Sequence, residues 1–355
     1  MTEIREYRDG DEKGILSLFK KVFKEDREVD YWKWLYLKNP AANSIIALAE
    51  DESKIVGQCT LLPSKMDFKG EHFLAGQSID TMVDSDYRGQ GLHKILAEKT
   101  YDIGKEKDIK IRTGFPSNDA LRGLLGSIGG TLTTGVPLYM NIYKLDNFLT
   151  AVFKIRPIAK IFSIPGIAFI KILHRDKKLK AEKNYEIREI KEFGEEFDVL
   201  STAISQKNKI MTVRSSNFLN WRIKDNPEID YTTQAAYLDE VLVGYIIVKT
   251  EDRTLKGNVK SRLGSIVDII ALDDDVVIAL NQKAKKYFKD RDVDFVAMWA
   301  TNSFEYKDVF SKLGFHKSKS TIPFVVKDLT EDEKFKDTIE DEKNWYLMPI
   351  ESDFY

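Results

Sequence analysis

Apolar side chains recur three and four positions apart over residues 11–23, which predicts an amphipathic helix facing a core. An aromatic run over 31–39 predicts a second helix, which Pro40 ends because the residue before a proline disfavours helical backbone. Further helices are expected at about 92–107 and 119–128. Shorter apolar runs predict strands, at 4–7, 44–49, 54–62, 73–83, 110–115, 131–136 and 139–144. The predicted order is β-α-α-β-β-β-α-β-α-β-β.

A turn with two glycines joins the strand over 73–83 to the helix after it. The turn reads Arg88-Gly89-Gln90-Gly91, followed by Leu92-His93. Backbone N–H groups at the start of a helix bind anions, and glycine lets the backbone approach a bulky one. The stretch therefore predicts a phosphate cradle. It is neither a P-loop nor the dinucleotide fingerprint, whose third glycine would stand at Lys94.

The chain also contains an internal repeat of widely spaced landmarks. The landmarks of the first half, in order, are Trp34 with Asn39-Pro40, Gly57, Asp80, and Asn118 with Gly130; those of the second are Trp221 with Asn226-Pro227, Gly244, Asp268, and Asn302 with Gly314. Their common order predicts two tandem domains, over 1–150 and 184–355, joined by a linker over 151–183.

The two predicted copies differ where the glycine turn stands in the first. The second copy has Asp273-Asp274-Asp275 there and no glycine. Three carboxylates repel a pyrophosphate, so we expect only the first copy to bind one. The same acidic residues also suit the positive end of a helix dipole, and the two interpretations are compatible.

Residues 151–183 are rich in lysine and arginine, with apolar residues between them. One interpretation is a helical linker that packs its apolar face on the two domains. The other is peripheral contact with an anionic membrane surface through 151–180.

Composition limits the remaining possibilities. A net charge of −2 over 355 residues gives no general attraction to nucleic acid. The single cysteine, Cys59, fits a reducing compartment, and no apolar run is long enough to span a bilayer, so we expect a cytoplasmic protein. The four histidines are not closely spaced, and no metal site is expected.

The stretch Arg88-Gly89-Gln90-Gly91-Leu92-His93 resembles the acyl-CoA pyrophosphate loop of the GNAT N-acyltransferase superfamily, with His93 in place of a final small residue. The predicted element order is also similar to that of the GNAT fold. The resemblance implies an α/β fold of two GNAT-like domains. Each would have a mixed, mostly antiparallel sheet, helices on both faces, and central strands that splay apart at 73–83 and 110–115.

The resemblance also implies acetyl-CoA as co-substrate. The residues expected to bind it are Met82, Val83, Arg88, Gly89, Gln90, Gly91, Leu92, His93 and Asn118. Asn118 would hydrogen-bond the pantetheine arm, or else cap a helix together with Ser117.

Two carboxylates are candidate general bases. Asp80 lies on the strand beside the expected thioester, although its repeat partner Asp268 suggests a shared structural duty. The terminal carboxylate at Tyr355 is the second, by resemblance to other tandem GNAT enzymes. The tyrosine that usually protonates the leaving thiolate is absent from Leu125, Gly126 and Phe310, which leaves Tyr139, Tyr143 or water.

The expected function is acetyl transfer from acetyl-CoA to a primary amine on a small molecule. An amino-sugar is the first choice, because the tail around Trp345 resembles tandem GNAT proteins of cell-surface polysaccharide synthesis. The alternatives are polyamine-like compounds, aminoglycosides or protein lysines as acceptors. A different class is a CoA-binding regulatory or scaffold protein without catalysis, which the missing tyrosine would favour.

Overall fold

The computed structural model describes residues 2–126, 128–144, 179–205, 209–255 and 258–353. Its contacts divide the chain into two compact units that do not follow chain order. The first unit contains Met1–Gly135, Ser205–Ile229 and Pro323–Trp345, and the second contains Val136–Ile204, Asp230–Ile322 and Tyr346–Tyr355. Most of the expected linker lies outside the described residues, and the domain boundaries expected from the sequence stay a prediction.

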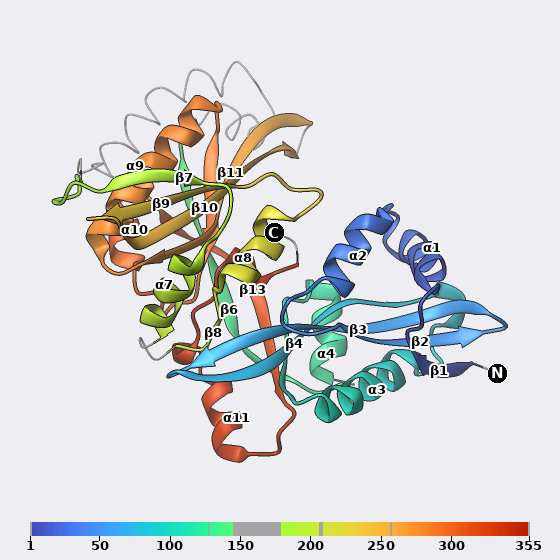
Figure 1. The fold of residues 1–355 in the computed structure, drawn as a ribbon. Helices are drawn as coiled ribbons and strands as arrows, with labels where there is room; N and C mark the ends of the chain where they lie inside the picture. Colours follow the sequence, from blue (N-terminus) through green and yellow to red (C-terminus); the bar gives the residue numbers. More distant parts are fainter. Residues whose placement is uncertain (1, 127, 145–178, 206–208, 256–257, 354–355) are drawn as a thin grey trace. The chain divides into compact units, whose positions relative to one another are not determined.

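The first unit is built from nearly all elements of the first 135 residues and a few later ones (Figure 1). These elements are β1 (Glu3–Glu6), α1 (Glu12–Phe23), α2 (Val29–Leu37), β2 (Ile45–Asp51), β3 (Lys54–Phe68), β4 (Glu71–Val83), η1 (Ser85–Tyr87), α3 (Leu92–Glu106), β5 (Ile109–Gly114), α4 (Asn118–Gly126), β8 (Met211–Thr212), α8 (Ser216–Leu219), the π-helical turn η2 (Asn220–Lys224), α11 (Glu333–Glu340) and η3 (Glu342–Asn344).

Its strands follow the order β1-β2-β3-β4-β5 across the sheet, and neighbours are antiparallel except β4 and β5. The parallel ladder of β4 and β5 ends at the pair Gln77 and Thr113, whereas β4 stays paired with β3 as far as Val83. Over its last residues β4 therefore has a free edge on the side of β5. This is the splay that the GNAT resemblance implies.

Helices cover both faces of this sheet. Helices α1 and α2 pack on one face around Trp32, Leu48 and Met82, and α3 and α4 pack on the other around Ala47, Cys59 and Leu96 (Figure 1). Because successive residues of β3 face the two cores in turn, the strand is buried almost continuously from Ile55 to Pro63.

The second unit repeats the same plan. Its elements are β7 (Glu186–Ile190), α7 (Glu195–Ser205), β9 (Thr232–Leu238), β10 (Val241–Leu255), β11 (Val259–Ala271), α9 (Asp274–Asp290), β12 (Phe295–Trp299), α10 (Lys307–Lys312) and η4 (Pro349–Glu351). The strands run β7-β9-β10-β11-β12, again antiparallel except for one parallel pair, β11 and β12. Each strand thus has a counterpart in β1 to β5.

The prediction of two separate strands at 131–136 and 139–144 is wrong. The structure has one strand there, β6 (Thr131–Ile142), and Pro137 lies inside it. The first unit instead places the end of β13 (His316–Asp328) antiparallel to β5, and in the second unit the end of β6 pairs with β12. Each unit thus takes its strand beyond the parallel pair from the other half of the chain.

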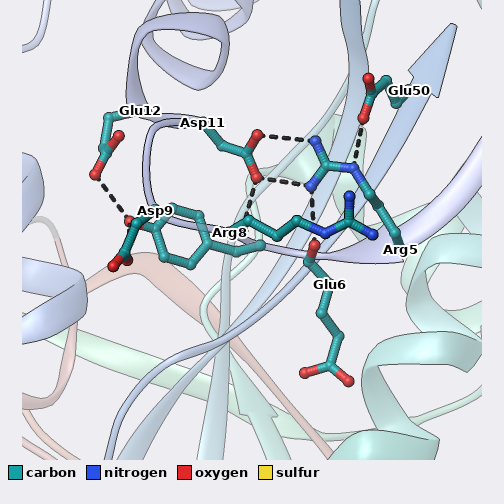
Figure 2. A network of polar contacts seen from close by, with 8 residues as sticks. Arg5, Glu6, Arg8, Asp9, Asp11, Glu12 and Glu50 are labelled. Atoms are coloured by element: carbon teal, nitrogen blue, oxygen red, sulfur yellow. Dashed lines mark hydrogen bonds and ion pairs between the residues drawn. The ribbon is translucent and has the colours of Figure 1, made fainter. Parts of the chain in front are cut away.

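Buried ion pairs tie the edge of the first sheet to helix α1. The Arg5 guanidinium of β1 is only 8% exposed and donates to both oxygens of Asp11 at 2.7 and 2.8 Å, and to Glu50 of β2 at 2.5 Å (Figure 2). The hydrogen bond from Arg5 is the main reason why the pKa of Asp11 is lowered. Strand β1, strand β2 and the start of α1 are thereby held together.

The tryptophans that mark the sequence repeat meet inside the first unit. The Trp34 indole N–H donates to the Trp221 carbonyl at 2.8 Å, and the Trp221 indole N–H donates to the Trp34 carbonyl at 3.0 Å. The two rings stack with centroids 5.4 Å apart, and both side chains are buried. Equivalent residues make reciprocal contacts, as they would across a two-fold axis.

Replacing either tryptophan by phenylalanine should destabilise the first unit by about 1–3 kcal/mol beyond the loss of ring area, because a buried carbonyl loses its donor. Urea unfolding measures this. Trp32→Phe is the matched control, because the buried Trp32 indole N–H has no hydrogen-bond partner. The two changes together should cost less than their sum. Equal losses for Trp32→Phe and Trp221→Phe would contradict the role of the reciprocal bonds.

Candidate active site

The turn after β4 places two glycines in left-handed backbone conformations. Gly89 has φ +80° and Gly91 has φ +77°, and Gly91 directly precedes the first residue of α3. A Cβ at either position would meet no atom within 4 Å. The space above both glycines is open, so glycine is needed here for the backbone conformation and for access to the turn rather than to avoid a clash.

The start of α3 presents backbone donors. The first hydrogen bonds of the helix run from the N–H groups of Lys94 and Ile95 to the Gly91 carbonyl. Among the described residues, no backbone group outside the regular elements accepts a hydrogen bond from the N–H groups of Gly91, Leu92 or His93. These donors lie at the positive end of a 15-residue helix.

The turn is anchored by one buried carboxylate, that of Asp84. Its side chain has no exposed surface and contacts Lys21 Nζ at 2.5 Å and Lys54 Nζ at 2.9 Å. It also accepts the Asp86 N–H at 3.2 Å, and the Asp84 N–H donates to Val56 at 2.8 Å. Burial raises the pKa of Asp84, but the hydrogen bonds from both lysines outweigh it, so the pKa lies well below its usual range.

The expected loop residues differ in exposure. Leu92 is buried in the core beneath α3, whereas Arg88, Gln90 and Gly91 are exposed. The His93 ring is half-buried, and its Cε1 would lie 3.6 Å from a Cβ at Gly123 of α4. Burial lowers the pKa of His93, so the ring is neutral at pH 7. The cationic side chain at the turn itself is therefore Arg88.

The free edge of β4 leads into this turn. Because Asp84 donates its N–H to Val56 of β3, the N–H of the preceding Val83 points the other way, toward the side that β5 leaves open. Met82 is paired with Gln58, and its side chain is buried against α1 and α2. Of the two expected backbone donors, Val83 therefore faces the open edge.

Asp80 lies on β4 a few residues before the turn. Its carboxylate accepts hydrogen bonds from Arg27 Nη1 and from the Tyr36 hydroxyl. Its side chain is 10% exposed. A carboxylate that accepts these hydrogen bonds has few lone pairs left for a proton. The contacts of Asp80 therefore favour a structural role over that of general base.

Two expected site residues cannot be placed by their side chains. Asn118 opens α4, but its side chain lies outside the described residues, as does Tyr355 altogether. Ser117 supplies the cap of α4, because its Oγ accepts the Ala120 N–H at 3.3 Å. Tyr139 and Tyr143 both belong to the second unit.

The helix start in the second unit is used differently. Asp273 caps α9 by accepting the Val276 N–H at 2.9 Å. Asp275 accepts the N–H groups of Glu182 and Lys183 at 2.7 and 3.1 Å. Carboxylates and a neighbouring chain segment thus occupy the place that the open glycine turn has in the first unit.

Among the described residues, no helix combines the length and apolarity that crossing a membrane needs. No group of three or more histidine, cysteine or acidic side chains there is arranged to hold a metal ion.

Comparison with known proteins supports the assignment of the fold. A family model described as an acetyltransferase (GNAT) domain matches residues 3–126. A GCN5-related N-acetyltransferase from Anabaena variabilis ATCC 29413 is similar in structure, with a TM-score of 0.65 and 13% identity over 93% of this chain and 73% of that one. No curated protein matches the sequence.

Two further solved structures have the same fold. A conserved protein of unknown function from Enterococcus faecalis V583 has a TM-score of 0.64 and 10% identity, over 93% of this chain and 73% of that one. A GCN5-related N-acetyltransferase from Kribbella flavida has a TM-score of 0.59 and 9% identity, over 92% and 71%. The similarity extends through both units.

Asp84→Asn should lower the free energy of unfolding by about 1–3 kcal/mol at pH 7, because a buried acceptor of two lysines loses its charge. The folded pKa of Asp84 lies below its unfolded value of about 3.9, so its contribution is present above that value and is lost as the pH falls toward the folded pKa. Urea unfolding at pH 7, 5 and 3.5 should therefore show a difference between wild type and variant that shrinks only at the lowest pH.

Asp86→Asn is the control for this prediction. Asp86 also contacts Lys21, but its side chain is 70% exposed, so the change should cost much less than Asp84→Asn does. A loss at Asp86 as large as that at Asp84 would mean that burial does not determine the effect.

Proposed function

From the premise that residues 3–126 belong to the GNAT acetyltransferase family, we propose that this chain transfers an acetyl group from acetyl-CoA to a primary amine. The observation that carries the proposal is the open turn at Gly89 and Gly91. It combines backbone donors at a helix start with an exposed arginine, next to a strand edge that no described strand pairs with.

In the proposed complex, the CoA pyrophosphate binds over residues 88–93. The N–H groups of Gly91, Leu92 and His93 donate to it, and Arg88 adds a positive charge. The pantetheine arm runs along the free edge of β4 and pairs there with backbone groups that lack a strand partner. Asn118, at the start of α4, would hydrogen-bond the arm.

The chemistry then needs a neutral amine and a donor for the oxyanion. The amine nitrogen attacks the thioester carbon, and the carbonyl oxygen gains a charge that the Val83 N–H stabilises. The C–S bond breaks, the thiolate takes up a proton, and the amine loses one. Holding the two reactants together at this edge supplies much of the rate enhancement.

The groups that move the protons stay predictions. Asp80 is one candidate base, but its carboxylate already accepts hydrogen bonds from Arg27 and from the Tyr36 hydroxyl. The terminal carboxylate at Tyr355 is the alternative base. Tyr139, Tyr143 or water would protonate the thiolate.

We propose a small-molecule acceptor, with an amino-sugar as the first candidate. Polyamine-like compounds, aminoglycosides and protein lysines are the alternatives. A non-catalytic CoA-binding regulator or scaffold is the second candidate function, and the observation that favours it is that Leu125, Gly126 and Phe310 stand where the usual acid would be a tyrosine. Peripheral membrane contact through 151–180 and a cytoplasmic location remain expectations.

We infer further that the two units are tandem copies of one domain and that only the first binds CoA. The matching strand orders and the reciprocal Trp34 and Trp221 bonds support the first point. The carboxylates of Asp273 and Asp275 at the start of α9 support the second.

The deciding experiment measures thiol release from acetyl-CoA over a panel of amines, together with CoA binding by calorimetry. Binding with acetylation of one amine class supports the enzyme and identifies its acceptor class. Tight CoA binding without turnover for any amine supports the scaffold. An absence of CoA binding refutes both.

Gly91→Glu should abolish CoA binding, because it puts a side chain and a negative charge into the pyrophosphate site. Calorimetry should show at least a hundredfold loss of affinity, on the order of two charge-assisted hydrogen bonds. Gly70→Glu is the matched control for backbone strain, since Gly70 has φ +85° and open space at a hairpin tip.

The corresponding charge change in the second unit tests the asymmetry of the two units. Asp274 is exposed in the first turn of α9, and Asp274→Lys should leave CoA affinity within about twofold of wild type. A similar loss for Gly91→Glu and Asp274→Lys would refute the assignment of CoA to the first unit alone.

A further inference from the structure

We propose that Arg27 and Tyr36 are positioning residues for the reaction. They hold Asp80 in a left-handed backbone conformation, and this conformation directs the Val83 N–H to the thioester arm. The proposal rests on the proposed function, because it concerns how the same site receives the pantetheine part of CoA.

A β-bulge interrupts β4 at Asp80. Thr60 of β3 is paired with Ile79 and Gln58 with Met82, so Cys59 alone stands opposite both Asp80 and Thr81. A bulge of this kind shifts the strand by one residue, and every backbone group beyond it then points to the opposite edge. Without the bulge, the N–H of Val83 would point to β3 and not to the free edge.

The bulge in the first unit is accompanied by an unusual backbone at Asp80. Its φ is +45°, which residues other than glycine adopt rarely and keep only where their surroundings hold them. Aspartate is among the residues that tolerate this region best. The conformation is therefore possible for Asp80 but has to be stabilised from outside.

The stabilising contacts come from separate elements. The Arg27 guanidinium contacts both oxygens of Asp80, Nη1 donating to Oδ2 and Nη2 to Oδ1 at 3.4 Å, and the Tyr36 hydroxyl of α2 donates to Oδ2. Gln58 Nε2 of β3 donates to the Asp80 carbonyl at 3.3 Å. Side chain and backbone of Asp80 are thus both held.

Arg27 is itself fixed by its surroundings. Its guanidinium lies 3.9 Å from the centre of the Phe19 ring of α1, and its side chain is 16% exposed. A planar guanidinium that is stacked on one side and ion-paired on the other loses little freedom when it holds a carboxylate. The helices α1 and α2 therefore fix a strand residue next to the proposed thioester position.

The second unit also has a register shift at the equivalent place, where β11 pairs with β10 at Ile266 and Asp268, but no residue there has a positive φ. Asp268 accepts a hydrogen bond from the Tyr245 hydroxyl at 2.9 Å and is fully buried, but its φ is not positive. An aspartate held by a tyrosine is therefore common to both units, whereas the left-handed conformation accompanies the open glycine turn. This association favours a role in ligand binding over a role in the fold alone.

The experiment compares CoA with adenosine 3′,5′-bisphosphate, which lacks the pantetheine arm and the outer phosphate of the pyrophosphate. Asp80→Ala should weaken CoA binding about tenfold, the effect of one lost hydrogen bond, and leave binding of the bisphosphate within about twofold. Asp80→Gly should retain most CoA affinity, because glycine adopts a positive φ without being held. A purely structural role for the carboxylate would make these two variants equivalent.

Arg27→Gln and Tyr36→Phe should reproduce the selective loss, and Arg27→Lys should recover part of it because the charge is kept while the fork is lost. Tyr36→Phe is the mildest of these changes and serves as the test if the Asp80 variants do not fold. Far-ultraviolet circular dichroism verifies folding.

The outcomes distinguish a failure of the proposed function from a failure of the positioning role. If wild type binds neither CoA nor the bisphosphate, the proposed function itself fails. If wild type binds CoA, but Asp80→Gly loses as much as Asp80→Ala, or Tyr36→Phe weakens both ligands equally, the positioning role is refuted.

Discussion

The site depends on the way β4 changes partners along its length. The strand stays paired with β3 to Val83, whereas its parallel ladder with β5 ends at Gln77. Backbone groups at this free edge need another partner, since unpaired polar groups are costly away from water. The glycine turn follows directly, so one strand supplies both the edge for an extended arm and the entry to an anion-binding helix start.

Buried charges keep this region rigid. Asp84 is held by two lysines where β4 ends, and Asp80 is held by Arg27 and Tyr36 a few residues earlier. Arg5 similarly links β1, β2 and α1 at the other edge of the sheet. Each pair joins a strand to a different element, so that losing one partner would leave an uncompensated charge in a poorly solvated place.

Local features of the site could be predicted from the sequence. The glycines at 89 and 91 and the strand before them indicated the turn, and in the structure both glycines have a left-handed backbone. The contacts of Asp80 could not be predicted, because Arg27 lies far away in the sequence in a loop without a motif. The sequence repeat marked Trp34 and Trp221 as equivalent positions. A sequence pattern does not say, however, that two equivalent residues contact each other.

The same limit explains the error at β6. The strands expected at 131–136 and 139–144 lie on either side of Pro137, which cannot donate to a sheet ladder, yet one strand continues through it to Ile142. That β13 supplies the neighbour of β5 follows from pairing between distant segments, which no local pattern encodes. Lys327 of β13 also donates to the carbonyl of Ile128, which lies beyond the end of α4, at 2.8 Å.

The division of the first unit among three chain segments has a consequence for biosynthesis. Its last segment ends at Trp345, so a ribosome must translate beyond that residue before this unit has all its parts. Domains usually fold in the order in which they emerge, whereas here the earlier portion waits with its apolar surfaces uncovered. We expect the nascent polypeptide to engage chaperones during that delay.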